Sequence, residues 1–270
     1  MNAFAAHFSF EFKSAVRNPS QLLMYYLFPL GVYLILAAIM TQLSPTFRTT
    51  LIPAMVLLAG MATFLLGLPG PYVDYRDGGV FRSYKLGGVP ASSILMIPVL
   101  TAIIHFLIAS AIIAASAGPL FSGALPRSWT AFLLVTLVAA LSYSTIAALI
   151  GVVASNSRVT MMLSQLIFLP SMLLGGLMVP TSMLPSSIQR ITYLLPTTHL
   201  MQLYLGYAYG SPGPEAPARA LAVLFAGIVL SFFLAVFLFQ WDRQESSRKR
   251  KPLIGLLAIV PFVVSMFLAA

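Results

Sequence analysis

The sequence alternates between long apolar segments and short polar ones, and the apolar segments are long enough to cross a membrane. A helix needs about 20 apolar residues to cross a hydrocarbon core of roughly 30 Å. Six segments meet this length and carry no formal charge in their interiors: 21–41, 51–70, 92–117, 130–154, 160–180 and 218–240. A seventh, 252–270, is only just long enough and has Pro261 in its middle. We expect an all-α integral membrane fold with six transmembrane helices and a seventh at the C-terminus.

The first twenty residues have a different pattern, in which apolar positions recur at helical spacing on one side only. Phe4, Phe8, Phe12 and Ala15 form the apolar side, and His7, Glu11, Ser14 and Asn18 form the polar side. This pattern predicts an interfacial helix over residues 1–20, lying in the inner membrane surface and leading into the first span. A frayed amphipathic tail is the alternative.

Two further polar regions lie after the fifth and sixth spans. Residues 183–210 are too short and too polar to cross a membrane, so they predict one or two short helices at the outer surface. Residues 241–251 contain the cations Arg248 to Lys251 and predict a basic cytoplasmic linker before residues 252–270, the additional span. The six-span domain itself is expected over residues 21–240.

Charged residues are few, and their distribution predicts the orientation of the chain. Hydrophobic residues make up 59% of the 270 residues and charged ones 8%, with fifteen Lys and Arg against six Asp and Glu. Eleven of the fifteen cations fall in segments that are cytoplasmic if the N-terminus is cytoplasmic, and the positive-inside rule favours that orientation. We expect a multi-pass protein of the cell (plasma or inner) membrane, with lipid as a partner. The cations occur in short runs between apolar segments, so no nucleic-acid partner is expected.

Several kinds of chemistry are missing from the sequence. It contains no Cys, which excludes thiol catalysis and Cys-based metal sites. Its acids lie outside the predicted spans, where they cannot couple transport to an ion gradient. Neither a G-x-S-x-G elbow nor a G-x-x-x-x-G-K-[ST] phosphate loop occurs. We therefore expect no enzyme activity and no catalytic, cofactor-binding or metal-binding residue in this chain.

His105 is the only His, Asp or Glu within a predicted span. A lone helical His is more often a structural residue bonded to a neighbouring helix than a gating or proton-carrying one. An intramembrane enzyme would need His105 together with an undetected partner. His7 belongs to the surface helix and His199 to the outer region, so the three imidazoles are not expected to meet at a metal ion.

The loop between the second and third spans holds an unusual share of the charges. Asp74 to Lys85 contains two acids and three bases, with a Gly-Gly pair inside it and another just after it. Val80, Phe81 and Tyr84 would form the apolar side of a short helix in this loop, residues 74–88. The alternative is an ordinary solvated loop that obeys the positive-inside rule.

Three stretches resemble the type-2 ATP-binding-cassette (ABC-2) exporter permeases, in that family's order and on its membrane side. They are EFKSAVRNP from Glu11, RDGGVFRSYKLGGVPASSILMIPVL from Arg76, and LPSMLLGGLMVPTSMLPSSIQRITYLLPTTHLMQLYLG from Leu169. The resemblance covers roughly residues 5 to 240. The segment 252–270 departs from the family's common pattern of six spans.

The resemblance implies roles for particular residues. The family's coupling helix, which docks on an ATPase subunit, falls on Asp77, Gly79, Phe81, Arg82 and Tyr84. The N-terminal helix, beside the same contact, has Glu11, Lys13 and Arg17. The outer gate would be formed by Pro185, Arg190 and Pro196. The substrate path between spans two and five of paired permeases would include Phe64, Phe168 and Met172, for which ordinary helix packing is the alternative.

The function implied by the resemblance is that of the transmembrane permease subunit of an ATP-driven exporter. Such a subunit pairs with a second permease, either a copy of itself or a sister chain, and with two copies of an ATP-binding-cassette ATPase subunit. The ATPase subunits bind ATP and Mg. The uncharged path favours a hydrophobic or amphipathic substrate, such as a drug, a lipid or a lipid-linked glycan. The alternative is a membrane scaffold or an assembly factor, which predicts no ATPase partner.

Overall fold

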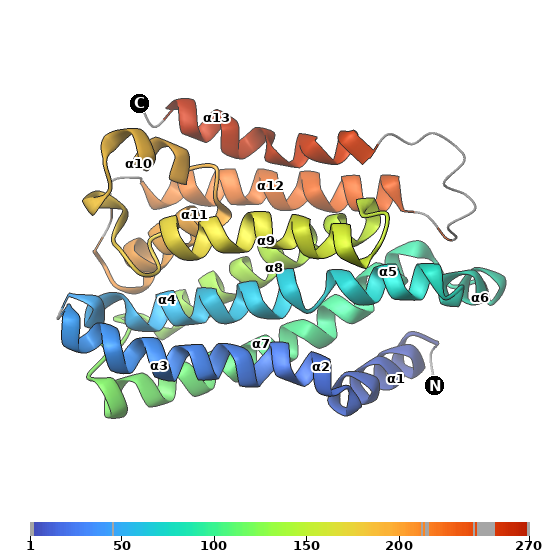
Figure 1. Ribbon diagram of the computed structural model, residues 1–270, viewed down its shortest axis with the longest axis horizontal. Coiled ribbons are helices and arrows are strands. Elements are labelled where there is room, and N and C mark those ends of the chain that lie inside the picture. The colour runs from blue at the N-terminus through green and yellow to red at the C-terminus, as the bar shows by residue number, and fades with distance from the viewer. Residues whose placement is uncertain are drawn as a thin grey trace.

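Helices account for all regular secondary structure in the part of the chain that the structure describes. The computed structural model describes residues 3–44, 46–211, 213, 216–239, 241 and 252–268. Six stretches within it are long and apolar enough to cross a membrane: Pro19–Leu43, Phe47–Asp77, Ser93–Phe121, Trp129–Val153, Ser157–Leu174 and Pro217–Leu238. They run side by side along the long axis of the molecule (Figure 1). This confirms the predicted all-α membrane fold.

The first two spans are each built from three consecutive helical pieces. The first span consists of α2 (Pro19–Leu22), η1 (Leu23–Leu27) and α3 (Phe28–Leu43), and the second of α4 (Phe47–Met61), η2 (Ala62–Leu66) and α5 (Pro69–Asp77). The pieces η1 and η2 are π turns, which hold one residue more than an α turn. In η2 the Gly67 amide accordingly donates to the Ala62 carbonyl, five residues back, at 3.1 Å.

The second span forms the centre of the bundle. In its most apolar stretch 94% of the residues are buried, against 22% in the first span. The remaining spans are α7 (Ala91–Phe121), α8 (Trp129–Val153), α9 (Ser157–Leu174) and α12 (Pro217–Leu238). Because the second span is apolar on all sides, it can bury its whole surface only by packing against several of these helices at once.

The N-terminal helix α1 (Ala3–Arg17) lies against α7, and its packed side includes Glu11 as well as Phe12 and Ala15 of the predicted apolar side. Glu11 is 4% exposed and Ala15 3% exposed, so the carboxylate lies on the packed side rather than on a solvated polar side. The helix packs on protein as well as on its surroundings, because Phe12 stacks on His105 of α7 with ring centroids 5.2 Å apart. The spacing of apolar residues alone does not show whether a helix face packs on protein or on lipid.

The region between the fifth and sixth spans forms two short helices with different environments. After the turn η3 (Thr181–Met183), α10 (Ser186–Thr192) lies at the surface, whereas all eight residues of α11 (Pro196–Leu203) are buried. This differs from the expected surface position of both helices. Two polar side chains of α11 bond within the chain: the Thr197 hydroxyl lies 2.8 Å from the Tyr143 hydroxyl, and His199 Nε2 lies 2.9 Å from the Tyr193 carbonyl. Gln202 Oε1, in contrast, is buried without a hydrogen-bond partner among the described residues. A third π turn, η4 (Tyr204–Ala208), follows.

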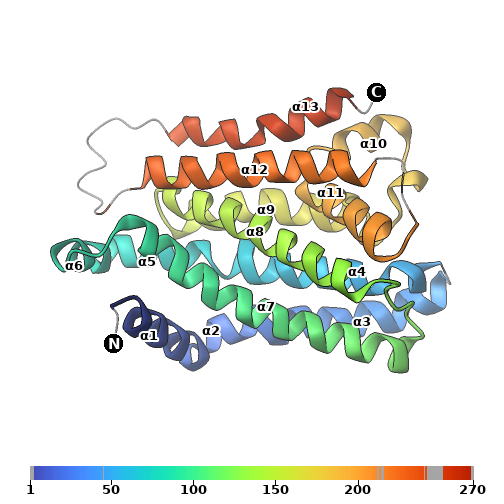
Figure 2. The same cartoon turned by 180° about the vertical axis from the view of Figure 1, so that it is seen from behind.

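The C-terminal segment is helical and packs along α12, as Figure 2 shows from behind. It consists of a 3₁₀ helix, η6 (Pro252–Ile259), and of α13 (Val260–Leu268). Phe262 is 3% exposed, and its ring lies so close to Gly227 that a Cβ atom there would approach it to 2.8 Å. Arg219 at the start of α12 donates to the Leu268 carbonyl at 3.3 Å. Of the predicted basic linker, residues 242–251 lie outside the described residues.

Candidate functional site

The charged loop predicted between spans two and three is a helical hairpin, residues 74–88, at the end of the bundle where α1 also lies (Figure 1). The helix α5 ends at Asp77, and α6 (Val80–Leu86) begins after two intervening glycines. The turn is made by Gly79 at φ 73°, a left-handed conformation that costs side-chain-bearing residues about 1–2 kcal/mol. Gly79 thus fixes the direction in which α6 leaves α5.

An aromatic contact holds α6 against the end of α12. Phe81 is 2% exposed, and its ring lies 6.2 Å from that of Tyr75 and 5.4 Å from that of Phe239. Trp241 continues this cluster, 5.3 Å from Phe239, and the Lys85 ammonium lies 5.7 Å above the Trp241 ring. Phe81 is buried within the chain, where its ring holds the hairpin in place, and its predicted contact with a partner stays a prediction.

Arg76 attaches the other side of the hairpin to the bundle. Its side chain is buried, and its Nη2 and Nη1 atoms donate to the carbonyl oxygens of Ala154 at 2.9 Å and Val152 at 3.4 Å. These carbonyls lie at the C-terminal end of α8, where the helix dipole favours a cation. Asp77 accepts from Arg76 Nε at 3.2 Å and pairs with its charge. The sequence predicted Arg76 only as a cytoplasmic cation, because the two carbonyls to which it donates are 76 and 78 residues away.

The outward side of α6 is basic with one apolar side chain at its tip. Arg82 and Lys85 are exposed, and Tyr84 is half-buried. Leu86 is 85% exposed, more than any other large apolar side chain in the described part of the chain. The sequence analysis did not identify Leu86 as a contact residue. The Gly-Gly pair that follows it does indicate the end of a helix. Of the five predicted contact residues, Asp77, Arg82 and Tyr84 are accessible and Gly79 shapes the turn.

The helix α1 lies close to this hairpin on its polar side. Burial raises the pKa of the Tyr75 phenol, and the nearby Ser14 side chain partly lowers it. Glu11 is buried, and burial raises the pKa of its carboxyl group. Burial raises the pKa of Tyr84 as well, with the charge of Glu11 as a second cause. Lys13 and Arg17 are exposed on the opposite side of α1, so the three predicted residues of this helix do not share one face.

His105 of α7 is surrounded by aromatic rings from α1 and η1. Its ring stacks on those of Phe12 and Tyr25, with centroids 5.2 and 5.0 Å away, and its Nδ1 lies 2.7 Å from the Tyr26 hydroxyl. Its Nε2 has no hydrogen-bond partner among the described residues. No group of three or more His, Asp or Glu side chains that could hold a metal ion occurs in the described residues. The contacts of His105 are those of a structural residue bonded to a neighbouring helix.

The predicted gate and path residues do not form one cluster. At the other end of the bundle, Pro185 and Arg190 of the α10 region are exposed, and Pro196 is buried at the start of α11. Phe64 is fully buried and lies 5.5 Å from Phe106, whereas Phe168 lies 6.3 Å from Phe28. Met172, one turn after Phe168 on α9, is half-buried. The two rings therefore contact different helices within one chain.

Comparison with known proteins gives a consistent assignment. The family described as "ABC-2 type transporter" matches residues 2–209, well over half of the chain. Nodulation protein J of Neorhizobium galegae is 29% identical over 98 residues, which cover 36% of this chain and 37% of that protein. The chain thus matches little more than a third of this curated relative's length. No solved structure matches. The chain belongs to the ABC-2 type transporter family.

Proposed function

We propose that this chain is the permease of an ATP-driven exporter that moves a hydrophobic or amphipathic substrate out of the cytoplasm, with ATP hydrolysed by a separate subunit. The exposed tip of α6 supports this proposal most directly. Leu86 stands uncovered beside the exposed cations Arg82 and Lys85, while Phe81 and Arg76 hold the helix to the bundle. An exposed apolar side chain beside two cations, on a helix that is packed against the bundle, is suited to docking a partner protein.

We propose that the hairpin and α1 face the cytoplasm. Both lie at one end of the bundle (Figure 1), which also carries Arg158 at the start of α9. The positive-inside rule supports this orientation. The α10 region and the Leu268 end of α13 then lie on the outer side.

The C-terminal segment would cross the membrane as a seventh span, because its geometry compensates for its length. The 8 residues of η6 rise about 2.0 Å each and the 9 residues of α13 about 1.5 Å each, which together give about 30 Å. This equals the thickness of a typical hydrocarbon core. The position of α13 alongside α12 (Figure 2) supports the same topology.

In the proposed mechanism, ATP binding brings two ATPase subunits together, and each moves the hairpin of one permease. Two permeases then change from inward-open to outward-open. The exposed apolar side chains of α9, Met161, Met162, Leu166, Leu169 and Leu173, support a surface for lipid or for a second permease. Phe168 and Met172 on the same helix, with Phe64 of the second span, are the residues we propose for the substrate path. The lack of charged side chains there supports an apolar or amphipathic substrate.

The test is copurification of ATPase activity with the tagged chain, extracted from its native membranes in mild detergent. The double variant Leu86→Asp with Arg82→Gln should lower the bound ATPase activity about tenfold or more, because central docking residues contribute most of an interface's affinity. The matched control is Leu43→Asp with Arg48→Gln, which changes an exposed Leu (72%) and an exposed Arg at the opposite end.

Two results would contradict the proposal. If both double variants retain the activity of the wild type, the ATPase docks elsewhere and the role of the hairpin is wrong. If no ATPase activity follows even the wild-type chain after crosslinking, the scaffold alternative replaces export.

A further inference from the structure

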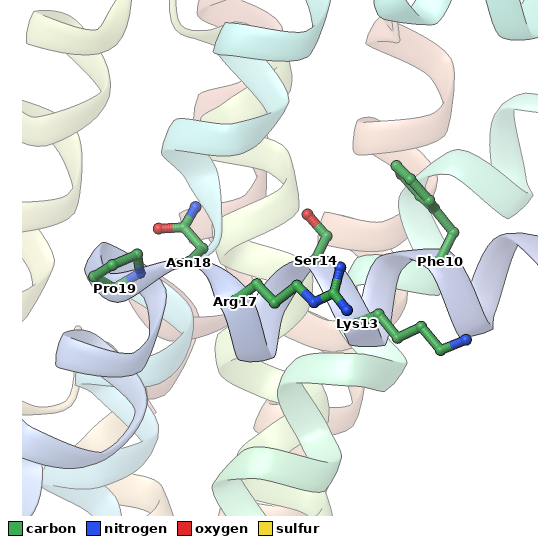
Figure 3. Close-up of a pocket in the computed structure, with 6 residues that line it drawn as sticks. All are labelled: Phe10, Lys13, Ser14, Arg17, Asn18 and Pro19. Carbon is green, nitrogen blue, oxygen red and sulfur yellow. The ribbon is translucent and has the colours of Figure 1, made fainter.

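A basic hollow lies where α1 turns into the first span. It has a volume of about 560 Å³ and is lined by Phe10, Lys13, Ser14, Arg17, Asn18 and Pro19. Figure 3 shows the long side chains of Lys13 and Arg17 extending from the same helix, with that of Arg17 running toward Lys13. No carboxylate lines the hollow, so its two cations present an uncompensated positive charge.

The packing of α1 explains why these side chains face outward. Glu11 and Ala15 are buried against the bundle, and residues two positions further along a helix point roughly the opposite way. Lys13 and Arg17 are therefore directed away from the protein, together with Phe10, which is 62% exposed. The one acid of α1 faces inward, and the cations of the outward face remain available to an anionic ligand.

The hollow lies at the start of the first candidate membrane span. The first membrane-spanning stretch begins at Pro19, which lines the hollow, and below it Leu23 (41%) and Leu27 (69%) are exposed. Asn18 accepts hydrogen bonds from the amides of Ser20 and Gln21 through Oδ1, so the NH₂ group of its side chain is left as a donor. Cations, a donor and an exposed aromatic ring above an apolar surface are typical of the interface of a membrane protein.

We propose that this hollow binds the phosphodiester headgroup of an anionic phospholipid, with the phosphate between Lys13 and Arg17. A lipid fits the position better than the ATPase subunit does, because α6 projects farther from the bundle than α1 does (Figure 1). A bound headgroup would fix α1 at the membrane surface, and with it the stacking of Phe12 on His105 of α7. The proposal requires a membrane location and does not depend on ATPase docking.

The test is a calorimetric titration of the detergent-purified full chain with dioctanoylphosphatidylglycerol. Two further ligands separate the possible sources of binding: dioctanoylphosphatidylcholine has the same chains and a zwitterionic headgroup, and glycerol phosphate has the phosphate without chains. The double variant Lys13→Gln with Arg17→Gln should weaken phosphatidylglycerol binding about 25-fold, since each cation near a membrane surface contributes about fivefold.

The matched control is Arg48→Gln with Arg158→Gln, which removes the same charge at two exposed positions outside the hollow. It should bind phosphatidylglycerol like the wild type. Lys13→Arg should keep most of the affinity, since the charge remains. Because all four altered side chains are exposed, the thermal midpoint of the free protein should not change.

Three outcomes would overturn the proposal. Equal weakening in both double variants would mean that net charge, and not this hollow, attracts the lipid. Equal affinity for glycerol phosphate and phosphatidylglycerol would mean a free phosphate site. Unchanged phosphatidylglycerol binding in the Lys13/Arg17 variant, with loss of copurified ATPase activity, would assign the surface to the partner protein.

Discussion

The guanidinium group of Arg76 donates a 2.9 Å hydrogen bond to the carbonyl oxygen of Ala154, and so joins the end of the second span to the end of the fourth. Hydrogen bonds that involve a charged group are the stronger ones in proteins, and they are strongest away from water. Ser157, just after this carbonyl, also donates to Asp74 at 3.1 Å. The hairpin is thus attached both to the span that carries it and to the α8–α9 turn.

Replacement of Arg76 should therefore destabilise the protein. Arg76→Met keeps the length of the side chain but leaves the carbonyls of Val152 and Ala154 without their donor, which costs about 2–3 kcal/mol. The measurement is the thermal midpoint of the purified protein in detergent. Arg158→Met, at an exposed position, is the matched control and should change the midpoint little. Equal midpoints for the two variants would show that the Arg76 contacts do not stabilise the fold.

The turn of the hairpin should depend on glycine at position 79. Gly79→Ala forces a side chain into the left-handed region and should cost about 1–2 kcal/mol. A Cβ atom there would meet nothing within 4 Å, so the cost comes from the backbone alone. Gly70→Ala in α5 also meets nothing within 4 Å and should be neutral or slightly stabilising. If both variants unfold at the same temperature, the turn does not constrain the hairpin.

Glu11 should make stability depend on pH. Burial raises the pKa of its carboxyl group above the ordinary value of 4.5, so the folded chain keeps this proton at a pH where the unfolded chain has released it. Stability from Glu11 is therefore complete below the ordinary pKa and is lost as the pH rises through the raised one. Glu11→Gln removes this loss, so its thermal midpoint should exceed that of the wild type increasingly as pH rises through this range.

The measurement for Glu11 is the midpoint of thermal unfolding from pH 4 upward in the same detergent. Asp74→Asn removes an exposed carboxylate on the same end of the molecule and serves as the control for a general change of charge. Parallel curves for the wild type and Glu11→Gln over the whole range would contradict a raised pKa.

The contact between Gly227 and Phe262 should hold the C-terminal helix in place. Gly227→Leu places a side chain where even a Cβ atom would approach the Phe262 ring to 2.8 Å, which should displace α13. Since the chain has no Cys, Ser265→Cys, at a position 1% exposed, gives a single thiol for maleimide labelling. It should react slowly alone and at least tenfold faster with Gly227→Leu. Gly31→Ala, which meets nothing within 4 Å, should leave the slow rate unchanged.

The parts of the fold that follow from the length of apolar segments were predictable, because crossing a membrane imposes a length on each helix. The six spans and the C-terminal helix belong to this class. The positions of α11, Glu11 and Arg76 were not predictable, because each depends on partners distant in sequence. Thr197 meets Tyr143 across 54 residues, and Arg76 meets Ala154 across 78. Polar residues with such distant hydrogen-bond partners can be buried. A prediction from the spacing of apolar residues alone places them at the surface.

In the hairpin too, some features were predictable from the sequence and others depend on partners distant in sequence. Its helical character and basic side followed from the spacing of Val80, Phe81 and Tyr84. Which of these residues would be buried did not, because Phe81 is covered by Phe239 of the sixth span.

The π turn η2 has a consequence for the movement of the second span. It lies between α4, which is packed on all sides, and α5, which carries the hairpin. If its hydrogen bonds changed from five residues back to four, α5 would rotate by about 100° about its own axis while α4 stayed fixed. The Tyr72 hydroxyl, donating to the Leu95 carbonyl at 2.7 Å, holds the present rotation. A change in this one turn would therefore redirect the charged end of the second span without disturbing the packing of α4.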